Sequence, residues 1–209
     1  MEDLLRAVLR NYRAYVRHKL YLAASMTYMY VAMSITVPVL AADLATKLLS
    51  LTGVLAAASI AAAITVGAAL AIYAMTSIWA VAAEQYAGLS GEGRPANVWR
   101  YFIIWASSFP AAYALSLALS APSYMVEEAW LLGVGLGNVG MGLWRRLPIP
   151  ALVGATCCAV YASLTMVPAS LAPYAAMLCM LFTYTAASMA YLILSRRELE
   201  RALKGSEHE

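Results

Sequence analysis

Charged residues are scarce in this chain: Asp, Glu, Lys and Arg make up 12% of it, whereas a soluble domain carries about a quarter. Residues of the set AVILMFWYC make up 63%. A water-soluble fold cannot hide that much apolar surface, so the lipid bilayer must surround most of it. The 209 residues allow several crossings and leave no room for a separate catalytic domain. We therefore expect one all-α, polytopic membrane domain over residues 1–209 and no nucleic-acid partner.

Side chains suited to catalysis are also rare. The only two histidines are His18 and His208, near the two ends, and the three cysteines fall inside apolar runs. There is no HExxH motif and no cluster of Cys and His ligands, so the chain lacks the metal-binding residues that zinc hydrolases and metal-dependent lipid transferases require. A Ser-His or Cys-His pair would lack its base within the apolar segments. We expect neither an enzyme nor a bound cofactor or metal.

No Asp, Glu, Lys or Arg lies near the middle of any apolar segment. Carriers driven by protons or sodium ions commonly place such a group at the membrane midplane, where it binds and releases a charge. The energy for any transport is therefore expected to come from another subunit.

The apolar segments predict six transmembrane helices. They cover residues 20–42, 54–83, 98–120, 129–144, 149–167 and 174–194, and residues 195–209 form a charged tail. With the N-terminus inside, 13 of the 14 basic residues fall on the cytoplasmic side and only Lys47 lies outside. Both termini and the polar break 84–97 are therefore expected to be cytoplasmic, in the plasma membrane.

Two short charged segments outside these spans have helical spacing. Asp43 and Lys47 follow the first span in a turn expected to be exposed to water, and they can pair if that turn is helical. Arg196 and Glu200 have the same spacing in the tail. Both pairs predict ion pairs along a helix.

The N-terminal segment 2–18 has four arginines at spacings of four, three and four residues: Arg6, Arg10, Arg13 and Arg17. On a helix they form one narrow stripe beside a broad apolar side. This pattern predicts an amphipathic helix in the membrane surface, with its arginines at the lipid headgroups. The alternative is a basic anchor before the first span with no separate role.

Small residues mark two of the predicted spans. Gly67 belongs to a row of small residues that recurs every four positions. Gly133 and Gly137 have GxxxG spacing in the glycine-rich fourth span, and Asn138 is the only amide within any span. Either these residues let helices pack closely, with Asn138 bonded to a neighbour, or they line a pathway.

The polar break after the second span opens with Glu84-Gln85 and includes Gly88, Arg94 and Pro95. With this loop, the order of parts resembles the membrane subunit of ABC transporters of the ABC-2 type. Members of that family typically have an amphipathic basic helix, two spans, a cytoplasmic E-x-x-x-G element followed by a proline, and four more spans. Here Leu4 to Arg17 matches the first helix, Glu84 to Gly88 matches the E-x-x-x-G element, and Pro95 matches the proline.

The resemblance implies that residues 84–97 dock on a separate cytoplasmic ATP-binding cassette subunit. It also implies that two permease chains, identical or homologous, form the exit path. One alternative for residues 84–97 is a solvated connector with no coupling role. An alternative function is that of a six-span substrate-capture protein, similar to those of energy-coupling-factor transporters; tight, saturable ligand binding without an ATPase would favour it. A second alternative is a membrane assembly protein that transports nothing.

Overall fold

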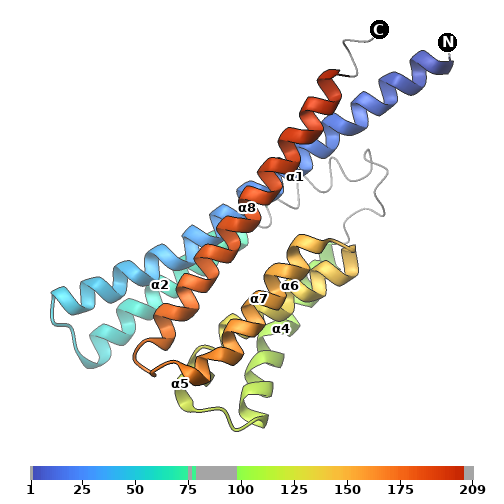
Figure 1. Ribbon diagram of the computed structural model, residues 1–209. Coiled ribbons are helices and arrows are strands. Elements are labelled where there is room, and N and C mark those ends of the chain that lie inside the picture. The colour runs from blue at the N-terminus through green and yellow to red at the C-terminus, as the bar shows by residue number, and fades with distance from the viewer. Residues whose placement is uncertain (1, 75–76, 79–97, 205–209) are drawn as a thin grey trace. The chain divides into compact units, whose positions relative to one another are not determined.

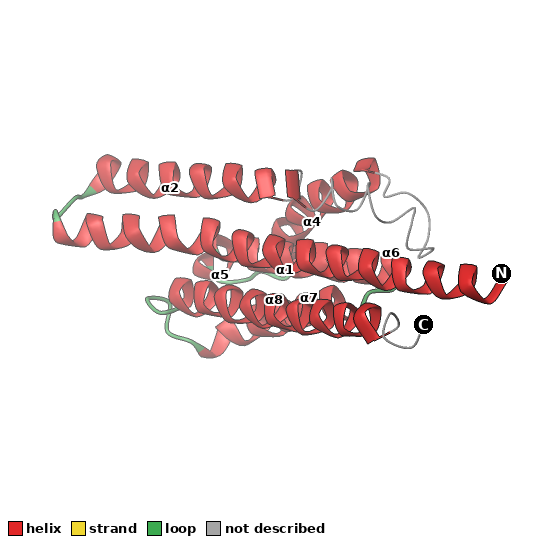
Figure 2. Ribbon diagram, turned by 90° about the horizontal axis from the view of Figure 1, so that it is seen from above, coloured by secondary structure: helices red, strands yellow, loops and turns green. Residues whose placement is uncertain are grey.

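The structure is a computed structural model that describes residues 2–74, 77–78 and 98–204 (Figure 1). Every regular element among these residues is helical (Figure 2). The elements are α1 (Glu2–Leu48), α2 (Gly53–Tyr73), α4 (Val98–Ala118), α5 (Ser123–Glu127), α6 (Ala129–Arg145), α7 (Pro148–Ser163), the 3₁₀ turn η2 (Leu164–Met166) and α8 (Ala172–Lys204). The expectation of an all-α chain is confirmed for the described part.

Four helical segments in the described part are long and apolar enough to cross a membrane. They are Asn11–Leu48, Gly53–Ala71, Pro148–Met166 and Ala172–Leu203. The expected third and fourth spans are helices α4 and α6, but both are shorter as apolar segments: Ile103–Ala118 in α4, and 17 residues in the whole of α6. Seventeen residues rise about 26 Å, somewhat less than the roughly 30 Å hydrocarbon core of a bilayer.

Helix α1 is continuous over 47 residues. The helix expected over 2–18 and the span expected over 20–42 are therefore parts of one continuous helix. No glycine or proline occurs before Pro38, so nothing in the sequence interrupts the ladder of backbone hydrogen bonds. A helix of this length measures about 70 Å, more than twice the roughly 30 Å hydrocarbon core of a bilayer.

The helices form two compact units, Met1–Ala96 with Ser188–Glu209, and Asn97–Ala187. Sequence analysis predicts a single membrane domain and gives no sign of this division. Helix α8 belongs to both units because it continues unbroken through Ala187 and Ser188.

In the first unit, the last part of α8 runs antiparallel to α1. His18 contacts Ser195, the ring centroids of Tyr21 and Tyr191 lie 6.0 Å apart, and the Ser25 and Ser188 hydroxyls lie 3.0 Å apart. Along this series the residue numbers rise in α1 and fall in α8, which is the order expected of two antiparallel helices. The start of α1 and the end of α8 consequently lie at the same end of this unit (Figure 1).

In the second unit, the glycines of α6 face two neighbouring helices. Gly133 and Gly137 lie against Phe109 and Trp105 of α4. Gly135 and Gly142, on the opposite side of α6, lie against α7. A Cβ atom at any of these positions would meet its neighbour at under 3 Å, so glycine is required for this close approach.

Helices α1, α4 and α6 end in the same way. Ser50, Ser120 and Arg146 each adopt a left-handed conformation, with φ of 51°, 52° and 54°. In each case the next residue donates its N–H to a carbonyl five positions back, as Ala121 does to Ser116 at 3.0 Å. This is the Schellman motif with a non-glycine residue at the position that glycine usually takes.

Candidate functional site

The candidate coupling loop lies outside the described residues. Its five candidate residues are Glu84, Gln85, Gly88, Arg94 and Pro95. One structural fact bears on it: the boundary between the two compact units falls between Ala96 and Asn97, at the end of this loop.

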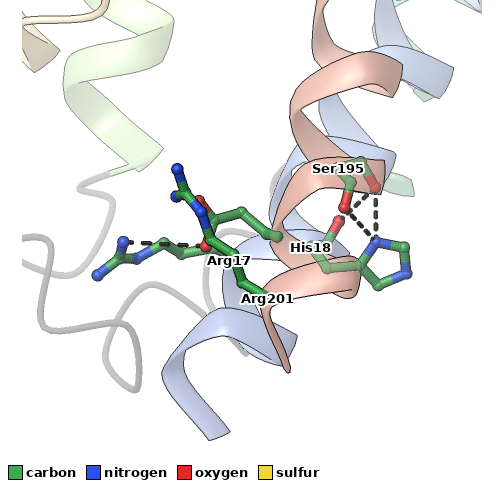
Figure 3. Close-up of polar contacts among 5 residues, drawn as sticks. Arg17, His18, Ser195 and Arg201 are labelled. Carbon is green, nitrogen blue, oxygen red and sulfur yellow. Dashed lines mark hydrogen bonds and ion pairs between the residues drawn. The ribbon is translucent and has the colours of Figure 1, made fainter. Parts of the chain in front are cut away.

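The arginine stripe of α1 is described from Arg13 onward, since the side chains of Arg6 and Arg10 lie outside the described part. Arg13 is exposed. Arg17 instead points along α8, where its Nη1 lies 4.0 Å from Oε2 of Glu198 (Figure 3). Nη1 of Arg201 lies 2.5 Å from the other oxygen of the same carboxylate. Arg17 therefore takes part in a contact between helices, which the expectation of a headgroup contact did not include.

Glu198 is 8% exposed, which is unusual for a carboxylate. Two guanidiniums beside it offset the cost of removing its charge from water. The exposed pairs of the same unit provide a contrast: Arg196 Nε lies 3.1 Å from Glu200, and Lys47 Nζ lies 2.8 Å from Asp43. Both of these pairs were predicted from their spacing and are confirmed.

His18 and Ser195 interlock α1 and α8 one turn away from Glu198 (Figure 3). The Ser195 hydroxyl donates to the backbone carbonyl of His18 at 3.0 Å. Since a hydroxyl has one proton, Nδ1 of His18 must donate to the Ser195 hydroxyl at 2.7 Å and to its carbonyl oxygen at 2.9 Å. The geometry thus assigns the proton to Nδ1 and joins two residues that are 177 positions apart.

Asn138 is buried within the second unit and bonded to a neighbour. Its Nδ2 donates to the carbonyl of Val134 at 2.9 Å and to the hydroxyl of Tyr184 in α8 at 2.7 Å. Both side chains are 3% exposed. With Gly133 and Gly137 packed against α4, these contacts are those of helix packing.

Gly67 of α2 packs against the backbone of α1. A Cβ atom at this position would overlap the carbonyl oxygen of Ser34 and lie 3.3 Å from the Cα of Ile35. The two helices can approach this closely only because Gly67 has no side chain.

Glu128 is a buried acid that directly follows an exposed one, Glu127. It precedes α6, is 6% exposed, and accepts a hydrogen bond from Trp130 Nε1 at 2.7 Å. Burial raises the pKa of the Glu128 carboxyl, the Trp130 hydrogen bond opposes the rise, and the charge of Glu127 adds to it. Nearby, the Tyr161 hydroxyl of α7 donates to the Met125 carbonyl of α5 at 3.1 Å and lies 2.6 Å from the Ser116 hydroxyl of α4.

Sequence analysis did not identify Glu198, Ser195 or Tyr184 as important. Glu198 stands three residues before Arg201, a spacing that indicates a possible pair, but its second partner is 181 positions away. Tyr184 and Ser195 are two of many tyrosines and serines in the chain, so no local signal singles them out.

Four helices that are long and apolar enough to cross a membrane indicate a helical membrane protein. In the described part, no three His, Cys, Asp or Glu side chains are close enough together to hold a metal ion. Comparison with protein-family models, with curated proteins and with solved structures finds no match for this chain.

Proposed function

We propose that the chain is the membrane-spanning permease subunit of an ATP-driven exporter of the ABC-2 type. It crosses the plasma membrane six times, has both termini in the cytoplasm and acts as a homodimer or heterodimer. A separate cytoplasmic ATP-binding cassette subunit binds the loop at residues 84–97.

The antiparallel pairing of α1 with α8 supports the proposed topology. Two neighbouring antiparallel helices that both cross a membrane have the start of one and the end of the other on the same side. Arg13 and Arg17 at one of these ends, and Arg196, Arg197 and Arg201 at the other, add the positive charge that favours the cytoplasmic side.

The observation that carries the coupling role is the position of the loop along the chain. Residues 84–97 end where the first compact unit ends and the second begins. A partner that binds this loop would hold the connection between α2 and α4. ATP-driven closure of the ATPase subunits would then rock the permease chains through this loop, as a rigid-body gate.

Affinity purification from native membranes, followed by mass spectrometry, tests the proposal. Full-length protein is expected to retain an ATP-binding cassette subunit, and Glu84→Lys is expected to lose it. Glu127→Lys, which makes the same charge change at the exposed last residue of α5 in the second unit, should retain it. If replacing residues 84–97 with a Gly-Ser linker of equal length leaves the ATPase bound, the coupling role is wrong.

A further inference from the structure

A shallow apolar groove lies where α4 begins and α6 ends, within the second unit. Its lining is Arg100, Ile103, Ile104 and Trp144, and its volume is about 180 Å³. Gly140 of α6 packs closely against one wall of the groove, since a Cβ there would lie 3.1 Å from Ile104 Cγ2. Ile103 is 60% exposed, so one wall of the groove faces the surroundings of the protein.

Two guanidiniums flank the Trp144 ring at the mouth of this groove. The Cζ atom of Arg100 lies 5.9 Å from the ring centroid, and that of Arg145 lies 5.7 Å from it. The two positive charges are therefore no more than about 12 Å apart. Among the residues that the structure describes, no carboxylate pairs with either arginine. Each guanidinium has a cation–π contact with Trp144.

This combination of features matches one class of ligand. A basic mouth at the end of a membrane helix attracts phosphate groups, and Trp prefers the level of the headgroups. The apolar wall formed by Ile103 and Ile104 suits the acyl chain of a lipid. A free phosphate ion has no such chain and would leave this wall without a contact.

We propose that this groove binds an anionic phospholipid. Arg100 and Arg145 contact the headgroup phosphate, Trp144 packs against the glycerol region, and one acyl chain runs along Ile103 and Ile104. The proposal requires only that α4 and α6 lie in the bilayer, so it is independent of any ATPase partner.

Native mass spectrometry of the full-length protein in detergent tests the site, with dioleoyl phosphatidylglycerol as the probe and dioleoyl phosphatidylcholine as the neutral lipid. Wild type should bind the anionic lipid at least tenfold more tightly. Each basic residue near a membrane surface contributes about 1 kcal/mol, so Arg100→Gln with Arg145→Gln should weaken binding roughly 30-fold. Arg197→Gln, an exposed arginine of the first unit, is the matched charge control and should change nothing.

Ile103→Trp fills the groove and leaves both arginines in place. It should weaken phosphatidylglycerol binding about tenfold, and gel filtration should show an unchanged elution volume for every variant. Equal binding of the two lipids by wild type, or unchanged binding in the double arginine variant, would overturn the proposal. So would full binding by Ile103→Trp together with displacement of the lipid by inorganic phosphate, since the site would then recognise only an anion.

Discussion

The hydrogen bond between the buried side chains of Asn138 and Tyr184 joins α6 to α8. Tyr184→Phe should lower the free energy of unfolding by about 1 kcal/mol, in the range measured for hydrogen bonds between membrane helices. Asn138→Leu should have a similar cost. Denaturant unfolding in mixed micelles measures both.

The double variant decides whether the two side chains act together. If Asn138 and Tyr184 act as one packing contact, the double variant should lose clearly less stability than the sum of the single losses. If the losses in free energy of unfolding of the two single variants simply add up in the double variant, the contact between the side chains contributes nothing. That result would favour a pathway role for Asn138.

Glu128 should give the protein a pH-dependent stability. Its pKa is raised in the folded state, so the folded protein binds a proton more tightly than the unfolded chain does. Its contribution is therefore fully present below the ordinary carboxyl pKa and is lost as the pH rises through the higher, folded value.

Glu128→Gln keeps the acceptor for Trp130 and removes the charge. This variant should match wild type in melting temperature at pH 4 and exceed it at pH 8, measured by thermal unfolding in detergent. Glu127→Gln keeps Glu128 but removes the neighbouring charge that adds to the rise in its pKa, so the melting temperature of this variant should depend on pH slightly less than that of wild type. A constant difference between Glu128→Gln and wild type at all pH values would contradict the assignment.

At the scale of single elements, the residues that end three of the helices have a strained, left-handed backbone. Ser120 has a φ of 52°, which is costly for any residue with a Cβ. Ser120→Gly should therefore raise the free energy of unfolding by about 0.5–1 kcal/mol. Ser107→Gly, at an exposed position inside the same helix, should lower it by about 0.5 kcal/mol. Two changes of the same sign in chemical denaturation would contradict this account.

The contact between the two helix ends in the first unit should be stronger than their surface ion pairs. Glu198→Gln removes a buried charge from between Arg17 and Arg201 and should cost about 1 kcal/mol, a modest value because both arginines are partly exposed. Glu200→Gln breaks the exposed pair with Arg196 and should cost close to zero. Unfolding of both variants in the same detergent provides the comparison.

Local sequence patterns predicted these elements better than their contacts. Each of the six expected spans is at least partly helical in the described part, because apolar runs between polar breaks are a local signal. Residues 2–18 and 20–42 share one helix because a change from amphipathic to apolar sequence does not by itself end a helix. The partners of Glu198, Asn138 and Ser195 depend on the register between helices far apart in the chain, which no local pattern contains.

At the scale of the whole molecule, the proposed topology determines which positions face the cell exterior. Single cysteines in a background with Cys157, Cys158 and Cys179 replaced by alanine can report this. Arg13→Cys and Arg197→Cys lie at the paired ends of α1 and α8, both exposed, and should react with a membrane-impermeant maleimide only after the cells are permeabilised.

Leu49→Cys provides the opposite case, because it follows α1 at its far end and is 68% exposed. It should react in intact cells if α1 crosses the membrane once. Labelling of exactly one of the two paired ends in intact cells would mean an odd number of crossings, which conflicts with an antiparallel α1 and α8 that both span. Labelling of both ends in intact cells would keep an even number of crossings but reverse the orientation, and the loop at 84–97 would then be unable to meet a cytoplasmic ATPase.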